Sequence, residues 1–440
     1  MPGRRWVVPL LGLIALACLA TVYVVDPPLY FGAVRALMMR PYQTPFMDLA
    51  QLPGAVGCWQ HGVDPYVVAS CDFLDRAFAY SPLWLRAGFL PTAQSATPWL
   101  GAVLAASVFL SLPLLPPPSG RGGVIALALA AFSSLPAFAM ERGNLDIAMF
   151  LMIIVGGWLC FRASAARLFG YPFFLLAGLL KFYPLVLCLL FLRERLGRAV
   201  LLGLATFALL ALFVVQYRAE LAEMARNLPN YGYFKDAFGA RQLAGGIGVA
   251  LHALGIERLP FLADFEPEKS AWLAVATLLL SHLAALATAL WFAMKPSLRS
   301  ALAMLTEAER GFLVIGAALI CGCFFVGQNA SYRGILFLFV VPGIARLALA
   351  PEPGPGRHLF RIAGGLILCL LWGLSLQQLV AWLSGGTDSP MGGSAAMNLY
   401  WILHEIAWWW VIAVLLGVLF CFVAEAPLWR SLLWRRAQAA

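Results

Sequence analysis

The chain has 440 residues, of which 62% are hydrophobic and 12% are charged, and its formal net charge is +9. A mean hydropathy of +0.84 leaves too few polar side chains to cover a water-facing surface, so the composition excludes a soluble globular protein. Long apolar runs recur from one end of the chain to the other, as in proteins that cross a bilayer. Backbone groups in lipid must be paired internally, and the ten-residue alternation of a barrel is missing. We therefore predict an all-α polytopic membrane protein.

The first expected span, 6–25, follows arginines at positions 4 and 5. Its apolar run is long, and DPP follows in place of a small-residue cleavage site, so we interpret it as an uncleaved membrane helix and not as a removed signal peptide. Residues 1–440 are expected to form one integral membrane domain of about 11–12 spans. The other expected spans are 98–115, 123–139, 144–161, 171–181, 183–193, 197–216, 271–293, 311–327, 333–350, 360–383 and 400–424.

The positions of the basic residues predict the orientation of these spans. With the N-terminus in the cytoplasm, the short cytoplasmic connections collect most of the arginines and lysines, as the positive-inside rule requires. These residues are Arg121, Arg162, Arg167, Arg193, Arg195, Arg198, Lys295, Arg299, Arg310, Arg357 and Arg361. We therefore predict that both termini are cytoplasmic, and we interpret the positive charge as an orientation signal and not as a nucleic-acid patch.

Residues 171–193 form an apolar stretch with basic residues on both sides, so both of its ends favour the cytoplasm. Lys181 and Pro184 lie in its middle. Proline disfavours helix at the residue before it, which predicts a break near Tyr183. A helical hairpin, re-entrant or short, with Lys181 at its tip satisfies both ends. One kinked span is the alternative.

Two long extracytoplasmic loops result, at 26–97 and 217–270. The stretches around Asp48 and Asp72 in the first loop are predicted as short interfacial helices, because aromatic residues accompany the charges. In an oxidising compartment Cys58 and Cys71 can form a disulfide, and two free thiols are the alternative. No cysteine or histidine spacing suggests a zinc site. The second loop contains Asn230, Tyr231, Gly232, Tyr233, Gly239, Gly245, Gly246 and Gly248.

Polar residues gather on one side of the expected topology. The stretch MERGNLD, at 140–146, sits between two apolar runs, and ionisable groups at membrane depth are costly enough to mark functional sites. A snorkelling interface turn is the alternative for this stretch. A transporter more often places such groups near the midplane. Glu141, Arg142, Asn144 and Asp146 are expected at the outer end of the fourth span. The other residues expected at the outer side are Asp48, Lys181, Gln328, Asn329, Tyr332, Arg333, His404 and Glu405.

This combination of residue types suits sugar transfer from a lipid phosphate. A carboxylate in a loop can act as a general base toward a hydroxyl group. Arginine and lysine at membrane depth can bind a phosphate whose lipid tail lies in the bilayer, and they can stabilise the charge that develops on it as it leaves.

Six stretches of the chain carry a family resemblance. They are PFMDLAQL, GVDPY, AYSPLW, ERGNLDIAMF, GLLKFYPLVLCLLFLRER and ASYRGILFLFVVPG, in this order over about positions 40 to 345. In these motifs the chain resembles glycosyltransferase family 87, whose GT-C fold enzymes use polyprenyl-phosphate sugars and include the bacterial mannosyltransferases of phosphatidylinositol mannosides. The resemblance implies a GT-C-like bundle in a bacterial plasma (inner) membrane, with an extracytoplasmic active site.

The resemblance also implies roles for residues. Asp48 matches the general base, while Asn144 and Lys181 match positions near the donor phosphate or sugar. Tyr332 and Arg333 match the Tyr-Arg pair of a late span, and Arg142 or Arg333 would help Lys181 stabilise the leaving phosphate. Supporting roles are expected for Glu141, Asp146, Asp64, His404 and Glu405.

The chain departs from the family pattern in two places. It has YSPL at 80–83 where the family often has Tyr-Pro-Pro-Leu, and no second acidic residue adjoins Asp48. The second departure favours an enzyme without a cofactor over one that needs a divalent metal.

We therefore expect an inverting glycosyltransferase that moves mannose, or another hexose or a pentose, from a polyprenyl-phosphate donor to a glycolipid or glycan acceptor. Membrane lipid is an expected partner and nucleic acid is not. Two alternatives are kept: a lipid-linked-sugar flippase or other transporter, and a non-catalytic membrane protein of envelope assembly.

Overall fold

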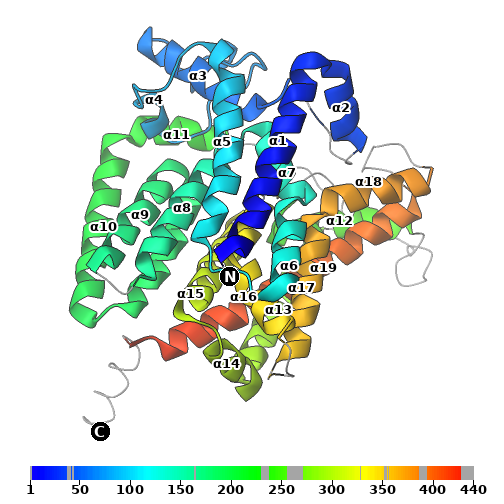
Figure 1. The fold of residues 1–440 in the computed structure, drawn as a ribbon. Coiled ribbons are helices and arrows are strands. Elements are labelled where there is room, and N and C mark those ends of the chain that lie inside the picture. The colour runs from blue at the N-terminus through cyan, green and yellow to red at the C-terminus, as the bar shows by residue number, and fades with distance from the viewer. Residues whose placement is uncertain are drawn as a thin grey trace.

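The computed structural model describes residues 2–36, 41, 44–162, 165–228, 237–254, 271–327, 329–350, 354, 356–385 and 394–427 (Figure 1). In this part of the chain nearly all regular structure is helical, as the composition predicts. The β structure described here is one antiparallel pair of two-residue strands, β1 (Ala237–Phe238) and β2 (Asn329–Ala330). Asn230 to Tyr233 of the second predicted loop lie outside the described residues.

Six helices among the described residues are long and apolar enough to cross a membrane. Three further pairs pass the same test but are bent, which makes up to nine candidate spans and suggests a multi-pass membrane protein. The six are α1 (Val7–Val25), α5 (Thr97–Ser111, which η3, Gln94–Ala96, and η4, Leu112–Leu114, extend), α10 (Leu196–Gln216), α13 (Ala271–Met294), α15 (Glu307–Val326) and α19 (Ala395–Glu425).

The bent pairs differ from the straight spans predicted at the same places. α6 (Gly120–Ala131) meets α7 (Ser134–Arg142) at 45°. η9 (Ser331–Phe339) meets α16 (Val341–Ala348) at 60°, and α17 (Arg357–Leu371) meets α18 (Gly373–Leu383) at 68°. Pro342 near the second bend and Gly373 at the third interrupt regular helix, and such residues commonly mark kinks.

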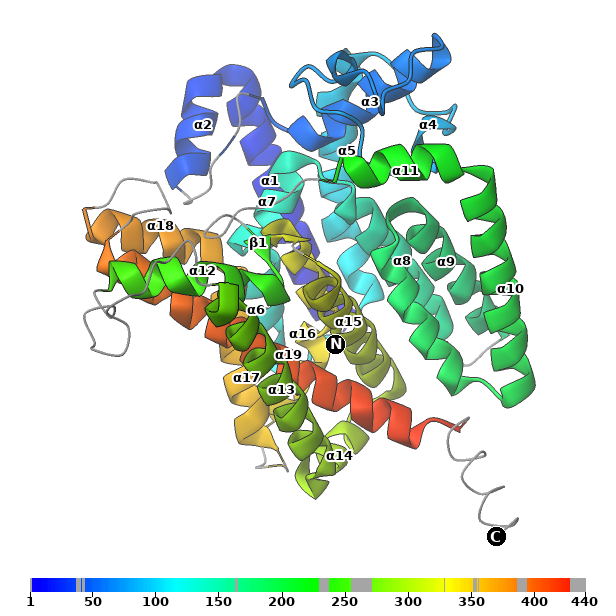
Figure 2. The same cartoon turned by 180° about the vertical axis from the view of Figure 1, so that it is seen from behind.

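Residues 170–193 turn back on themselves, as the helical-hairpin prediction requires. α9 (Gly170–Lys181) is followed by Phe182 at φ 56° and by the 3-10 helix η6 (Tyr183–Arg193). The beginning and the end of the hairpin lie together, because Glu194 accepts a hydrogen bond from the Tyr171 hydroxyl at 3.1 Å and pairs with Arg167 at 3.2 Å. Lys181 therefore lies at the opposite end, at the tip. The short apolar helix α8 (Asp146–Cys160) packs beside α9 (Figure 2).

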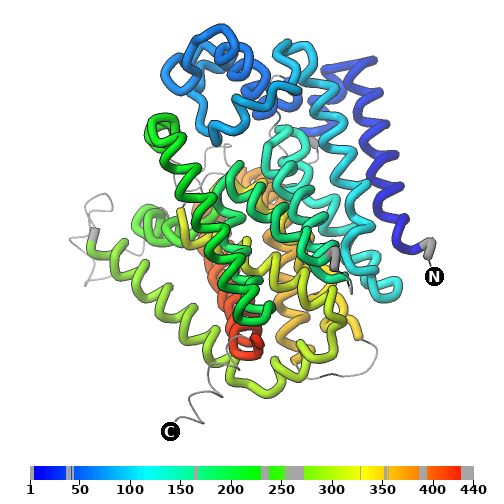
Figure 3. Tube along the Cα trace, turned by 90° about the vertical axis from the view of Figure 1, so that its left-hand side faces the viewer, coloured from blue at the N-terminus to red at the C-terminus, as the bar shows by residue number. Residues whose placement is uncertain are grey.

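One end of the helix bundle carries a cap, which we define as residues 44–96 with α11 (Arg218–Arg226). It contains α3 (Met47–Gln60), η2 (Ala69–Cys71) and α4 (Pro82–Leu85). Figures 1 and 3 show the cap at the end away from the start of α1 and the end of α19. A disulfide joins Cys58 to Cys71, with Cα atoms 6.0 Å apart.

The predicted helix around Asp72 is wrong, since only η2 lies there and Asp72 itself is extended. The backbone carbonyls of Arg76 and Ala77, which a helix would pair internally, instead accept hydrogen bonds from Gln51 Nε2 at 3.2 and 3.3 Å. A long-range partner therefore satisfies this backbone without a helix.

The remaining helices complete the bundle. η1 (Pro2–Trp6) precedes α1, and α2 (Pro27–Ala36) follows α1 and packs back on it. α12 (Ala240–Ala253) packs on α13 and α19, while α14 (Pro296–Ala303) and η5 (Ala165–Phe169) connect helices at the end away from the cap (Figure 2). Aromatic stacking fills the centre, where Phe150 lies 4.8 Å from Phe339 and Phe238 lies 4.5 Å from Trp408, centroid to centroid.

Candidate functional site

The MERGNLD stretch is a turn between two helices. α7 ends at Arg142, Gly143 takes the left-handed conformation at φ 60°, and α8 begins at Asp146. The Asn144 N–H donates to the Ala139 carbonyl at 3.1 Å, which closes the helix end in the manner of a Schellman motif. The Asn144 side chain accepts from the Asp146 N–H at 3.0 Å. Glu141 and Arg142 thus belong to the end of the third predicted span, not to the start of the fourth.

Helix α3 of the cap rests on this turn. The Phe46 N–H, just before α3, donates to the Glu141 carbonyl at 2.7 Å. A Cβ atom on Gly143 would lie 3.0 Å from the Cβ atoms of Leu49 and Phe46. Glycine at position 143 therefore permits both the left-handed turn and the close approach of the cap.

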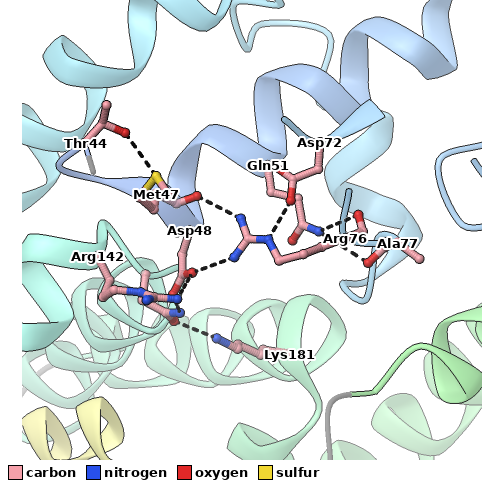
Figure 4. Close-up of polar contacts among 10 residues, drawn as sticks. Thr44, Met47, Asp48, Gln51, Asp72, Arg76, Ala77, Arg142 and Lys181 are labelled. Atoms are coloured by element: carbon pink, nitrogen blue, oxygen red, sulfur yellow. Dashed lines mark hydrogen bonds and ion pairs between the residues drawn. The ribbon is translucent and has the colours of Figure 1, made fainter. Parts of the chain in front are cut away.

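The carboxylate of Asp48, in the first turn of α3, is buried and has three partners (Figure 4). Its Oδ1 atom pairs with Arg142 Nη2 at 2.6 Å and with Arg76 Nη1 at 3.1 Å. Its Oδ2 atom accepts from Asn144 Nδ2 at 2.8 Å. Burial by itself raises the pKa of Asp48, but the charge and hydrogen bond of Arg142, with help from Asn144 and Arg76, hold that pKa below its ordinary value.

A second ion-pair centre lies beside the first. Lys181 Nζ pairs with Asp146 Oδ2 at 2.8 Å, and Arg333 Nε reaches the same oxygen at 3.3 Å. Lys181 also donates to Asn144 Oδ1 at 3.0 Å. Because Asn144 donates to Asp48 and accepts from Lys181, it joins the two centres. We call the joined set the charged cluster: Asp48, Arg76, Arg142, Asn144, Asp146, Lys181 and Arg333.

Aromatic rings surround the cations of the charged cluster. Lys181 Nζ lies 5.3 Å from the ring centroid of Tyr80 and 5.9 Å from that of Tyr332. The Arg333 guanidinium lies 4.9 Å from the ring of Tyr183. Cations over aromatic faces are held in place without being neutralised, so they keep charge to offer to an anion.

Sequence reasoning missed Arg76. Its guanidinium bridges three groups, since Nε pairs with Asp72 at 2.5 Å, Nη1 with Asp48 at 3.1 Å, and Nη2 donates to the Met47 carbonyl at 3.0 Å. The available signal was an arginine in a loop rich in aspartate, four residues after Asp72. Nothing in the sequence links position 76 to position 48, because the fold creates that contact.

The structure separates three of the expected supporting residues from the charged cluster. Asp64 is exposed, and its carboxylate accepts from the Tyr66 N–H at 2.9 Å, so it stabilises a cap turn. His404 Nδ1 lies 3.1 Å from Glu405 Oε1, and both residues line a cavity between α7, α18 and α19. The position of Asp64 therefore gives no reason to assign it a role in the charged cluster. His404 and Glu405 line the cavity between α7, α18 and α19 and are not members of the charged cluster.

The cluster's residue types suit an anion better than a metal ion. Within the described residues, no three His, Cys, Asp or Glu side chains group in a way that could hold a metal ion, and the expectation of an enzyme without a metal cofactor stays a prediction. A phosphate would find three guanidinium groups and an ammonium group within one connected network, each able to trade a carboxylate partner for a phosphate oxygen.

No protein-family model, no curated protein and no solved structure matches this chain.

Proposed function

We propose that this protein is an inverting glycosyltransferase that takes its sugar from a polyprenyl phosphate. The observation that carries the proposal is the carboxylate of Asp48 held between Arg76 and Arg142, with Lys181 one hydrogen-bonded residue away. The site thus offers a base for a hydroxyl group and cations for a phosphate within one network. The motif resemblance to glycosyltransferase family 87 supports the same assignment.

The finer architecture belongs to this proposal: a GT-C-like bundle in a bacterial inner membrane, with cytoplasmic termini and an extracytoplasmic cap. Two observations support this orientation. A disulfide lies in the cap, and disulfides persist in oxidising compartments. Arg193 contacts Glu307 at the other end of the bundle, where several basic connections lie, as expected for a cytoplasmic side.

Arginine exchange is the first step of the proposed mechanism. The donor phosphate binds Arg142 and Arg76, and these guanidinium groups turn from Asp48 toward the phosphate oxygens. The released carboxylate regains basicity, because the charges that lower the pKa of Asp48 now face the donor. A base that is masked until the donor binds would also suppress wasteful reaction with water.

Sugar transfer follows as one in-line displacement. Asp48 takes the proton of the acceptor hydroxyl as the hydroxyl oxygen forms a bond to the anomeric carbon. The bond from that carbon to the phosphate oxygen breaks, and its electron pair leaves with the polyprenyl phosphate. Lys181 and an arginine, Arg142 or Arg333, stabilise the negative charge on the leaving phosphate. A single displacement inverts the anomeric configuration.

The test offers purified protein in nanodiscs a panel of short-chain polyprenyl-phosphate sugars, with a membrane glycolipid extract as acceptor, and follows release of polyprenyl phosphate. We expect release from one donor and its loss in Asp48→Asn. Asp75→Asn is the matched control, since Asp75 is an exposed aspartate of the same cap at φ 51°, a conformation that asparagine tolerates.

Two results would overturn the proposal. One is equal release by a folded Asp48→Asn variant and the wild type. The other is donor binding without release from any member of the panel, which would favour the transporter or the assembly protein.

A further inference from the structure

An apolar groove lies between three helices at the end of the bundle away from the cap. It has a volume of about 150 Å³ and is lined by residues of α6, α16 and α17, which Figure 1 shows together near the start of α1. Apolar cavities of about this volume bind a ring of the size of benzene. The groove therefore has room for several carbon atoms of a hydrocarbon chain.

Small residues keep the groove open. Gly364 and Gly365 of α17 line it, together with Ala345 and Ala348 of α16. A Cβ atom on Gly365 would meet no described atom within 4 Å, so the space beside this glycine is free for a ligand.

The surroundings of the groove indicate that it faces lipid. Ile125 of α6 and Ile362 of α17, each next to a lining residue, are 59% and 54% exposed. Both helices belong to bent pairs that are long and apolar enough to cross a membrane. Exposed apolar side chains on such helices lie against acyl chains, so the groove is open to the acyl chain of a lipid.

An arginine lies at one end of the groove. Arg361 lines the groove, and its Nε atom donates to the carbonyl of Ala348, the last residue of α16, at 3.1 Å. This contact caps α16, but it uses only the Nε–H group. The N–H groups on both Nη atoms have no acceptor among the described residues, so they can donate to a ligand.

A second arginine precedes Arg361 by one turn. Arg357 is the first residue of α17 and lies four positions earlier, which places it on the same face of the helix. Its Nε atom is buried and has no hydrogen-bond partner in the described part of the chain. Two like charges at this spacing repel each other, and the start of a helix adds partial positive charge. An anion bound beside both arginines would relieve this repulsion.

The apolar groove and its basic end together select the ligand. Guanidinium groups bind phosphate oxygens, and basic pockets between membrane helices bind anionic lipid headgroups. No carboxylate is among the described lining residues, so nothing there would attract the ammonium group of a zwitterionic lipid. We propose that this groove binds an anionic phospholipid, with its phosphate at Arg361 and Arg357 and an acyl chain beside Gly365.

This lipid is distinct from the proposed sugar donor. The donor phosphate is assigned to the charged cluster, which lies next to the cap, whereas Arg357 and Arg361 lie at the opposite end of the bundle (Figure 1). Binding of an anionic phospholipid therefore does not rest on the proposed transfer reaction.

Native mass spectrometry of the full chain in detergent measures the affinity for each probe. The probes are phosphatidylglycerol and phosphatidylcholine with the same acyl chains, and glycerol 3-phosphate as a phosphate without chains. We expect phosphatidylglycerol to bind about tenfold more tightly than phosphatidylcholine, as one additional charge-assisted contact predicts, and glycerol 3-phosphate to bind far more weakly than either.

A first pair of variants tests the place of the acyl chain. Gly365→Leu fills the groove without pressing on described atoms, and leucine is a better helix former than glycine, so the fold should persist. It should weaken phosphatidylglycerol binding at least about tenfold, because the chain loses its apolar contacts. Gly203→Leu is the matched control on α10, where a Cβ atom also meets open space, and it should leave binding unchanged.

A second pair of variants tests the headgroup. Arg361→Gln removes the charge but keeps an N–H donor for the Ala348 carbonyl, so it should weaken phosphatidylglycerol binding about tenfold and leave phosphatidylcholine binding unchanged. Arg195→Gln removes an exposed arginine that precedes α10 at the same end of the bundle, outside the groove, and should change neither affinity.

Several results would overturn the inference: equal affinities for the two phospholipids, binding of glycerol 3-phosphate as tight as that of phosphatidylglycerol, unchanged binding in Gly365→Leu, or equal losses in Arg361→Gln and Arg195→Gln. Binding of a short-chain polyprenyl phosphate that Gly365→Leu abolishes, without binding of phosphatidylglycerol, would assign the groove to the donor lipid instead. None of these measurements involves sugar transfer. A failure of the proposed reaction and a failure of this site are therefore distinguishable.

Discussion

Asp48 and Arg142 form an ion pair at 2.6 Å although 94 residues separate them in the chain. Asp48 comes from the cap and Arg142 from the last turn of α7, so the pair ties the cap to the helix bundle. The exposed fraction of the side chain is 7% for Asp48 and 12% for Arg142. In such surroundings either charge left alone would be poorly solvated, and the position of the cap therefore depends on both.

A double-mutant cycle tests this coupling. Asp48→Asn and Arg142→Met should each lower the free energy of unfolding by about 3–5 kcal/mol, and the double variant should lose less than the sum by more than about 1 kcal/mol. Unfolding in mixed detergent micelles measures these values. The exposed pair Glu223 and Arg226 is the control, with an expected coupling of at most about 0.5 kcal/mol. Additive losses at Asp48 and Arg142 would contradict the coupling.

The lowered pKa of Asp48 predicts a loss of stability in acid. Because its pKa in the folded protein lies below the ordinary 3.8, ionised Asp48 stabilises the fold above that pH. This contribution is lost as the pH falls through the folded-state pKa. We expect wild-type cap stability, followed by limited proteolysis, to fall below about pH 4. Asp48→Asn should show a smaller fall over the same range, and an unchanged acid profile in this variant would contradict the assignment.

Gly143 should tolerate alanine less well than a glycine with similar backbone geometry. Gly143 and Gly62 both have positive φ, at 60° and 76°. A Cβ atom at Gly143 would press on Leu49 and Phe46, whereas one at Gly62 meets open space. Gly62→Ala should cost about 1 kcal/mol of backbone strain, and Gly143→Ala about 1–3 kcal/mol more from overpacking. Thermal unfolding of the two variants compares them, and equal losses would show that the cap does not rest on this turn.

Most helices could be predicted from the sequence, because long apolar runs indicate membrane-spanning segments and the basic residues at their ends predict the orientation of these segments. The hairpin with Lys181 at its tip followed from basic residues on both sides of one run and from Pro184. The bends at 45°, 60° and 68° were not predicted, since hydropathy measures how apolar a segment is and not its direction.

The charged cluster was predicted in part. Arg142, Asp146, Lys181 and Arg333 were identified because charge at membrane depth is costly, whereas Asp48 and Asn144 were assigned their roles from the motif resemblance. The partner Arg76 was missed because a loop arginine carries no such signal, and its role depends on how α3 folds over the α7–α8 turn. His404 and Glu405 were assigned to the same outer side, but the α17–α18 bend gives them a cavity of their own.

The Cys58–Cys71 disulfide should stabilise the cap. It closes a loop with a sequence separation of 13, which corresponds to about 3 kcal/mol in the chain-entropy account. Replacing both cysteines by serine should therefore increase proteolysis within 44–96 while leaving the helix bundle intact. Mass spectrometry of the fragments locates the cuts. Replacing Cys18 by serine, a free and exposed cysteine of α1, is the control, and a cap equally resistant without the disulfide would contradict the prediction.

Lys181 provides the sharpest test of the proposed phosphate site. Its ammonium group pairs with Asp146 at 2.8 Å, and Asn144 links Lys181 to Asp48 by hydrogen bonds. A donor phosphate bound beside Asp48 would therefore interact with the positive charge of Lys181. Under the proposed reaction, Lys181→Met should lower kcat by about 100-fold, as expected when one group that stabilises a developing negative charge is lost. Lys181→Arg should recover part of that loss, because it keeps the charge but changes its shape. Lys295→Met is the control, since Lys295 lies over Trp291 next to α14, far from the cap. If Lys181→Met kept wild-type kcat with the chosen donor, the leaving phosphate would have to be stabilised elsewhere, and the charged cluster would be a structural anchor of the cap.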